Sequence, residues 1–569
     1  MGPVRMLLPL LRATARLAPG TGGTLLGAAL LHCAAPARVL LRPPSTARRS
    51  AWAAEAVAVY GPSGEGAHPG QRHRDALSRA LAVHANTLAL SERYEEAGAE
   101  ADAALSVPGA RPSPALTAYA VHVRAQALAG RGRAEEALVS ATEVVERYRR
   151  LVPGRRDRAL GGLPGALRTQ ALVLGALGRT TESVAAYEEC AALLRAMPVR
   201  ELARVQLVRP RVLAELTGGL RTLGRYEDAL AAGAEAREAA HGVLVLAFPE
   251  IVRPLRVRLR TDLALCHSAT GSPAAARTHA EEAVAEARAL DAQPQWLAVA
   301  LNCLAGVLAE LPSCDEQLST LTELTGLSAR LAADRPEVFE PLLADALDDL
   351  ARCHRRTGDH VKAVADTERA VAVYRRTGRH EGQLARVLAN LSIRQCDADD
   401  AESAVSSARE AVTLTRGLAE SDGDACRSLL ARRLCVLARA LGRTGDHLAA
   451  GACYGEAESL LTGSPGADAD ELAATVSDLA VALGRAVLDR LTSGRPEEAV
   501  AALRSLLALT HRSDATDVHA RCVITFARAH AERPDDVVRA WEQAVGEPYP
   551  TFVYRRTDTR GRASNPAAR

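Results

Sequence analysis

The chain has 569 residues, a formal net charge of +2, and 48% hydrophobic residues. A single hydrophobic core stops growing near ~250–300 residues, so the length excludes one compact core and the composition excludes global disorder. Aromatic residues make up only 3%, isoleucine occurs three times, and Ala, Leu, Arg and Glu dominate. Because these four residues favour helices and strands favour β-branched and aromatic residues, we predict an all-α protein.

The charge is unevenly distributed. Residues 1–50 hold seven arginines and no acid, and residues 555–569 carry a charge of +4, which leaves −9 for residues 51–554. A negatively charged body matches nucleic acid poorly, because neutralisation of phosphates dominates that affinity. We therefore expect no nucleic-acid partner.

Residues 1–50 form a basic segment with two short apolar runs. Its apolar runs, Met6–Leu11 and Leu25–Cys33, are too short for a membrane-spanning helix. We expect a disordered or peripheral segment in a cytoplasmic protein, and an exported or membrane-associated protein is the alternative. A mistaken start codon is a further alternative, because Ala54–Tyr60 resembles the second helix of a repeat whose first helix is missing.

A short phrase recurs along the chain: Leu-Gly or Thr-Gly, several mostly polar residues, then Ala. It is clearest at Leu223–Ala229, Thr357–Ala363 and Thr444–Ala450. The last position of each copy falls at 97, 137, 183, 229, 276, 318, 363, 404, 450 and 499. The steps of 40 to 49 residues between them predict a tandem repeat.

Each phrase is typical of the turn between two helices. Gly adopts the left-handed conformation that often ends a helix, and Asp359 and Asp446 follow it as candidate N-caps. Small residues recur four and seven positions after the final Ala, which predicts a close helix–helix contact in every repeat. Examples are Ala101, Ala104, Gly233, Ala236, Ala280, Ala283, Ala408 and Ala411.

This pattern resembles the tetratricopeptide repeat over roughly residues 75–545, with Tyr187 and Tyr454 where that family often has an aromatic residue. The resemblance implies an α-solenoid, a right-handed superhelix of about ten antiparallel hairpins of an extended-period bacterial type. The family's usual period is ~34 residues, so HEAT-type repeats of ~40–47 residues are the alternative. We expect the array to span residues 51–545, with a partial repeat and linker at 51–74, and a disordered basic tail at 546–569.

Motifs of common enzymes are missing from the sequence. Lys362 is the only lysine, and no glycine run precedes it, which excludes a P-loop. His380-Glu381 begins a zinc-protease motif, but Leu384 stands where the second histidine is required. Eleven scattered cysteines without a Cys-x-x-Cys pair favour reduced thiols. We predict a protein without catalytic activity, cofactor or metal.

The resemblance implies that the first helix of each hairpin lines a concave groove that binds a peptide or a partner protein. Arginine forks suit carboxylates, so we expect an acidic peptide or acidic C-terminus as ligand. The predicted groove residues are Arg168, Arg211, Arg221, Arg258, Arg352, Arg355, Arg386, Arg432, Arg439, Asn86 and Gln126. The alternative function is that of a regulatory or sensor fragment of a larger bacterial signalling protein, an NTPase or transcription regulator. Homo-oligomerisation through the same face is a further alternative.

Overall fold

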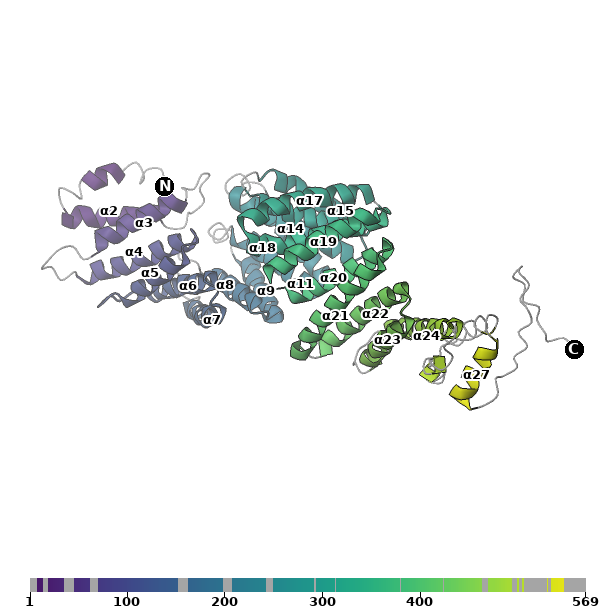
Figure 1. Cartoon of the computed structure of the whole chain (residues 1–569). Coiled ribbons are helices and arrows are strands. Elements are labelled where there is room, and N and C mark those ends of the chain that lie inside the picture. Colours follow the sequence, from purple (N-terminus) through teal and green to yellow (C-terminus); the bar gives the residue numbers. More distant parts are fainter. Residues whose placement is uncertain are drawn as a thin grey trace. The chain divides into compact units, whose positions relative to one another are not determined.

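The structure is a computed structural model in which every regular element of the described residues is an α-helix, as predicted (Figure 1). The described residues are 8–13, 19–34, 46–61, 70–151, 162–197, 207–241, 249–290, 293–312, 314–378, 380–422, 424–462, 469–493, 499–500, 504–505, 530 and 534–546. None of the helices in these ranges is both long enough and apolar enough to cross a membrane.

The chain divides into two compact units, Met1–Pro312 and Ser313–Arg569. The helices of the first unit are α2 (Pro19–Ala34), α3 (Thr46–Tyr60), α4 (Gln71–Ala89), α5 (Tyr94–Ser106), α6 (Pro114–Gly130), α7 (Ala134–Leu151), α8 (Gly162–Ala176), α9 (Thr180–Ala196), α11 (Val208–Thr222), α12 (Tyr226–Ala239), α14 (Pro249–Ala269), α15 (Pro273–Arg288) and α16 (Pro294–Ala309).

The second unit has the same kind of helices. They are α17 (Cys314–Asp334), α18 (Pro336–Arg356), α19 (His360–Thr377), α20 (Glu381–Asp397), α21 (Ala401–Asp422), α22 (Asp424–Thr444), α23 (His447–Thr462), α24 (Ala469–Thr492) and α27 (Pro534–Val545). Within each unit, a helix contacts the next one in the chain, and most first helices also contact the first helix of the next hairpin. This tandem packing of hairpins is tetratricopeptide-like.

The turn at Gly224 shows how a hairpin reverses direction. Gly224 has a φ of 74°, the left-handed region that glycine tolerates best. The N–H of Arg225 donates to the carbonyl of Leu220 at 2.9 Å, and the N–H of Gly224 donates to the carbonyl of Arg221 at 3.0 Å. These two bonds form a Schellman motif, which satisfies the last carbonyls of α11. The same pair of bonds recurs at Gly132, Gly178, Gly271 and Gly358.

The N-caps predicted for two second helices are present. The Asp359 carboxylate accepts a hydrogen bond from the backbone N–H of Lys362 at 3.1 Å, and the Asp446 carboxylate accepts one from Ala449 at 3.2 Å. Both aspartates therefore satisfy donors that the start of a helix leaves unpaired. In two copies that lack the glycine, Glu92 and Asp399 take the left-handed conformation instead, with φ of 60° and 61°.

The final position of each phrase is buried. Those alanines are fully shielded from solvent at positions 97, 137, 229, 276, 363, 404, 450 and 499. The copy expected near Leu318 is wrong by one residue, because Gln317 is buried there and Leu318 is only half-buried. Leu321 and Leu324 follow Gln317 at the expected four and seven positions and are buried. A buried glutamine is tolerated at this position because its amide oxygen accepts a hydrogen bond from Arg356 at 3.2 Å.

The N-terminal segment differs from the expectation of a disordered or peripheral stretch. Residues 19–34 form α2, which packs against α3 and α4. Leu30 and Cys33 share a core with Tyr60 and Ala80. The hairpin at the N-terminal side of the array thus has its first helix, which the sequence pattern had left unassigned.

At the other end of the chain, α27 ends at Val545. The basic tail predicted at 546–569 lies outside the described residues from position 547 onwards.

The close approach of the helices predicts a cost for enlarging an anchor alanine. Ala229→Leu on α12 should lower the free energy of unfolding by about 1–3 kcal/mol, because Ala229 is fully buried and overpacking forces its neighbours apart. Ala231→Leu, at an exposed position of the same helix, is the matched control and should be nearly neutral. Thermal unfolding of the full chain measures both, and an unchanged midpoint for Ala229→Leu would refute the register.

The turn geometry yields a second prediction. Gly224→Ala should destabilise the chain by about 1–2 kcal/mol, because a side chain is strained at this positive φ. Gly306→Ala is the control, since Gly306 lies exposed within α16 with no atom within 4 Å of its added Cβ. That substitution should stabilise the helix by about 0.5–1 kcal/mol. Urea unfolding would contradict this reading of the turn if both variants shifted the midpoint in the same direction.

Candidate binding surface

All the predicted groove residues lie on the first helices of hairpins. On α11, Arg211, Glu215 and Gly218 follow one another at intervals of four and three residues, which places them on one face of the helix. On α14, Arg258 and Asp262 occupy the corresponding positions, counted back from the turn glycine. We call this recurring face of the first helices the stripe. Its side chains decide what the surface can bind.

In the first unit, ion pairs join the stripes of successive helices. Arg168 on α8 donates two hydrogen bonds to the Glu215 carboxylate on α11, at 3.0 and 2.6 Å. Arg221 on α11 donates to Asp262 on α14 at 2.9 Å. Both carboxylates are buried. Burial raises the pKa of Asp262, whereas the positive charges of Arg221 and Arg258 act in the opposite direction.

A polar contact between uncharged groups joins the preceding pair of first helices, α6 and α8. His122 on α6 is buried, and its Nε2 lies 2.8 Å from Oγ1 of Thr169 on α8. Burial lowers the pKa of His122 to about 4, and the positive charge of Arg168 adds to that effect. The predicted groove residue Gln126 lies 3.3 Å from the same imidazole nitrogen. Gln126 is therefore partly engaged within the fold.

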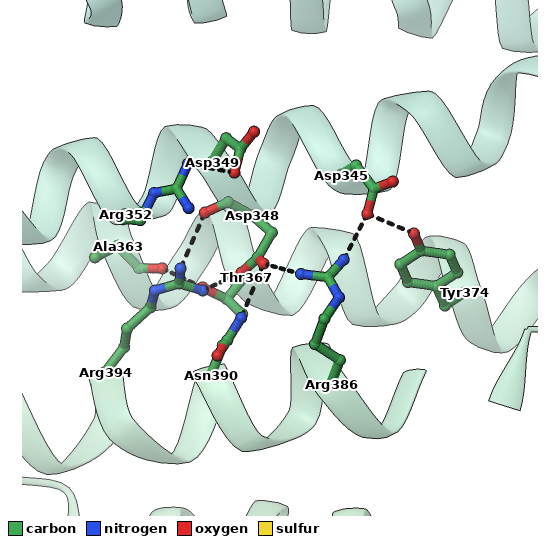
Figure 2. A network of polar contacts seen from close by, with 10 residues as sticks. All are labelled: Asp345, Asp348, Asp349, Arg352, Ala363, Thr367, Tyr374, Arg386, Asn390 and Arg394. Carbon is green, nitrogen blue, oxygen red and sulfur yellow. Dashed lines mark hydrogen bonds and ion pairs between the residues drawn. The ribbon is translucent and has the colours of Figure 1, made fainter. Parts of the chain in front are cut away.

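In the second unit, a polar network centres on a buried aspartate, and Figure 2 shows side chains of α20 reaching toward α18. The Asp348 carboxylate accepts hydrogen bonds from Arg386 at 2.7 Å and from Asn390 at 2.9 Å, and it forms an ion pair with buried Arg394. Arg394 also donates to Oγ1 of Thr367 on α19 at 2.7 Å. Asp348 thereby links three helices.

The same network is electrically balanced. Asp345 accepts hydrogen bonds from Tyr374 at 2.8 Å and from Arg386 at 2.5 Å. Asp349 accepts one from Arg352 at 2.7 Å (Figure 2). With Asp348 and Arg394, the three carboxylates face three guanidinium groups. The arginines of this network therefore carry no spare charge toward a ligand.

The sequence predicted nine arginines that would bind a ligand, but these ion pairs already engage several of them. Five of the nine are paired with carboxylates of the chain itself: Arg168, Arg221, Arg352, Arg355 and Arg386. The sequence reasoning considered only the arginines, whereas the stripe carries acids in the corresponding positions of neighbouring helices. Its buried polar residues Glu215, Asp262, Asp348 and Arg394 were missed.

Six predicted residues remain outside these carboxylate pairs, and one of them is Gln126, which contacts His122. Arg211 is half-buried on α11, Arg258 is exposed on α14, and Asn86 is half-buried on α4. Arg432 and Arg439 lie exposed on α22, and Arg439 shares a hydrogen bond with Tyr454. The predicted residues are divided between the two units, with those up to Arg258 in the first and those from Arg352 in the second.

A hollow of about 450 Å³ between α5, α6 and α7 is a different kind of feature. Its charged lining is already paired: Arg131 with Glu95 at 2.8 Å, and Arg133 with Glu136. Within the described part of the chain, no three His, Cys, Asp or Glu side chains are grouped closely enough to hold a metal ion.

The buried network generates a prediction for the second unit. Asp348→Asn should lower the free energy of unfolding by about 3–5 kcal/mol, because it leaves the buried Arg394 without its countercharge. The neighbouring change Asp349→Asn breaks a partly exposed pair with Arg352 and should cost less than about 1 kcal/mol. Urea denaturation of both variants distinguishes the two positions, and equal losses would show that the network is not centred on Asp348.

Comparison with known proteins gives structural likenesses only, since no family model and no curated protein matches the sequence. A signal-transduction ATPase with a tetratricopeptide repeat sensor, from Pyrococcus horikoshii, is 14% identical with a TM-score of 0.47; the match covers 67% of this chain and 52% of that one. This chain thus spans about half the length of that ATPase.

Two further solved structures are matched by this chain over a larger share of their own length than the ATPase is. The apo form of RapI is 11% identical with a TM-score of 0.46, covering 70% of this chain and 98% of that one. The quorum sensor NprR from B. thuringiensis is 13% identical with a TM-score of 0.45, covering 60% and 88%. Since all three TM-scores lie below 0.5, the tetratricopeptide-like description rests on the hairpins and turns of this chain itself.

Proposed function

We propose that this chain is a non-catalytic scaffold that binds a segment of a partner protein on the stripe of its first helices. The observation that supports this most is the constant register of the repeats. This register buries the alanine anchors of the second helices, and Arg211 and Arg258 stand at equivalent positions of α11 and α14. In repeat arrays, such a face provides an extended binding surface.

Rigidity also favours binding. The pairs Arg168–Glu215 and Arg221–Asp262 hold successive first helices in fixed positions in the first unit. A surface that is already ordered loses little conformational entropy when a ligand binds, so more of the contact energy appears as affinity. The face is therefore suited to recognition by shape and charge.

The chemistry of the described residues gives little support to catalysis. Burial raises the pKa of the Cys190 thiol to about 12 and that of Cys266 to about 11. These cysteines stay protonated at neutral pH and are poor nucleophiles. The free cysteines of the described residues fit a reducing compartment, which supports the cytoplasmic location that we propose together with this function.

The proposal is tested with peptides that are not chosen in advance. The purified full-length chain would be used to select binders from a random library of dodecapeptides displayed on phage, with empty beads as the control. We expect enriched peptides that bind the free chain in fluorescence anisotropy. A benzophenone in such a peptide should cross-link to first helices such as α11 and α14. Failure to enrich any peptide, or cross-links confined to second helices such as α12 and α15, would overturn the proposal.

A further inference from the structure

The stripe of the first unit has an excess of positive charge that the network around Asp348 lacks. Between α8 and α14 it carries four guanidinium groups and two carboxylates, Arg168, Arg211, Arg221 and Arg258 with Glu215 and Asp262. The network around Asp348 has equal numbers of both. The excess is local, because residues 51–554 together carry −9.

Arg211 is the more enclosed of the two surplus arginines. Burial lowers the pKa of its guanidinium, the positive charge of Arg168 adds to this, and Glu215 acts in the opposite direction. Glu215, however, is bonded through both oxygens to Arg168. Among the described residues, no carboxylate lies within ion-pair distance of Arg211 or Arg258. An incoming anion would therefore meet cations that are only weakly compensated.

Gly218 allows the charges of two helices to approach each other. Gly218 is buried on α11, and a Cβ added there would lie 3.2 Å from Oδ2 of Asp262 and 3.6 Å from Nη2 of Arg258. The side chains of Arg258 and Asp262 on α14 thus lie against the backbone of α11, the same helix that carries Arg211. A larger residue at position 218 would displace them. The missing side chain leaves room for the Arg258 guanidinium against α11, the helix that also carries Arg211.

Apolar side chains lie beside this patch. Leu265 is seven residues after Arg258 on α14, two helical turns or about 10 Å along the axis. Its exposed fraction is 38%, and that of Leu172, at the matching position of α8, is 40%. Leucines this exposed on both sides of Gly218 offer apolar contact area next to the cationic positions. The surface is therefore cationic along one row and apolar along the next.

We infer that α8, α11 and α14 form the binding site for an acidic segment of a partner protein, with its carboxylates on Arg211 and Arg258 and apolar side chains on Leu172 and Leu265. This inference rests on the proposed function and adds the place and the chemistry of the ligand. A guanidinium group binds a carboxylate with two parallel hydrogen bonds, which are strongest where water is partly excluded, as around half-buried Arg211. Nucleic acid is disfavoured as the occupant, because the negative body repels it.

The test compares peptide selections on matched variants of the full-length chain. The selection from the random dodecapeptide library is carried out on the wild type, on Arg211→Glu/Arg258→Glu and on Arg211→Gln/Arg258→Gln. Arg149→Glu/Arg195→Glu is the control, because it changes the net charge as much as the first variant and alters exposed, already paired arginines of the second helices α7 and α9. Leu172→Ser/Leu265→Ser tests the apolar row. Circular dichroism melting verifies that each variant is folded, and the Gln variant keeps the test decisive where the Glu variant is unfolded.

Peptides selected on the wild type should be rich in Asp and Glu beside an apolar residue. Their affinity should fall about ten-fold or more in both Arg211/Arg258 variants, which corresponds to about 1.4 kcal/mol or more, because charge-assisted contacts are lost, and it should stay within about two-fold in the control. It should also fall when both leucines are replaced. Selected peptides that are not acidic, or that bind the Arg211/Arg258 variants as tightly as the wild type, would overturn this inference while leaving the proposed function intact. Failure to select any peptide would overturn both.

Discussion

The architecture depends on a steric constraint at one position of each repeat. At the first buried position of most second helices, the chain accepts a residue no larger than alanine, as at Ala229 and Ala363. Small side chains there and one and two turns later let neighbouring helices approach closely, and packing density leaves no room for a larger group. Because this contact recurs every 40 to 49 residues, it fixes the rotation of each hairpin. The fixed rotation determines which side chains of the first helices share a face.

On this shared face, some arginines are paired with carboxylates of neighbouring helices and others are not. A buried ion pair such as Arg394–Asp348 loses hydration on both partners, and its Coulomb attraction only offsets this loss when the remaining hydrogen-bonding groups are satisfied. The network around Asp348 meets this condition through Asn390 and Thr367. In the first unit the pair Arg168–Glu215 meets it, since both oxygens of Glu215 are bonded, whereas Oδ2 of Asp262 has no hydrogen-bond partner. Among the described residues, Arg211 has no carboxylate within ion-pair distance. Similar registers thus produce a closed network around Asp348 and leave Arg211 and Arg258, among the described residues, without a paired carboxylate.

The fold could be predicted from the sequence because its signals are local. The glycine turn, the aspartate cap and the small residues of the second helix all lie within about a dozen residues of each other, as around Gly358. The sequence pattern misplaced the anchor at Gln317 and did not assign α2, because the local turn and helix signals are weak at both places. Gln317 lacks a turn glycine before it, and α2 contains Gly20, Gly22 and Gly23, which disfavour helix when considered alone. Packing against α3 and α4 stabilises α2 in spite of them.

The partners of the arginines could not be predicted from local pattern, because they are one repeat away. Glu215 follows Arg168 by 47 residues, and Asp262 follows Arg221 by 41. Applying the repeat spacing to the acids as well as to the arginines would have revealed both pairs. By contrast, no spacing reveals that Arg211 lacks a carboxylate, since that depends on how Glu215 divides its two oxygens between neighbours.

The most direct measurement of this division is a pair of double-mutant cycles on the free energy of unfolding. The first cycle combines Arg168→Ala with Glu215→Ala, and the second combines Arg211→Ala with Glu215→Ala. If Arg168 is the partner of Glu215, the first cycle should give a coupling energy of about 1.5–3 kcal/mol and the second less than about 0.5 kcal/mol. A coupling between Arg211 and Glu215 as large as that between Arg168 and Glu215 would show that Arg211 is already neutralised and that the first unit has no open cationic surface.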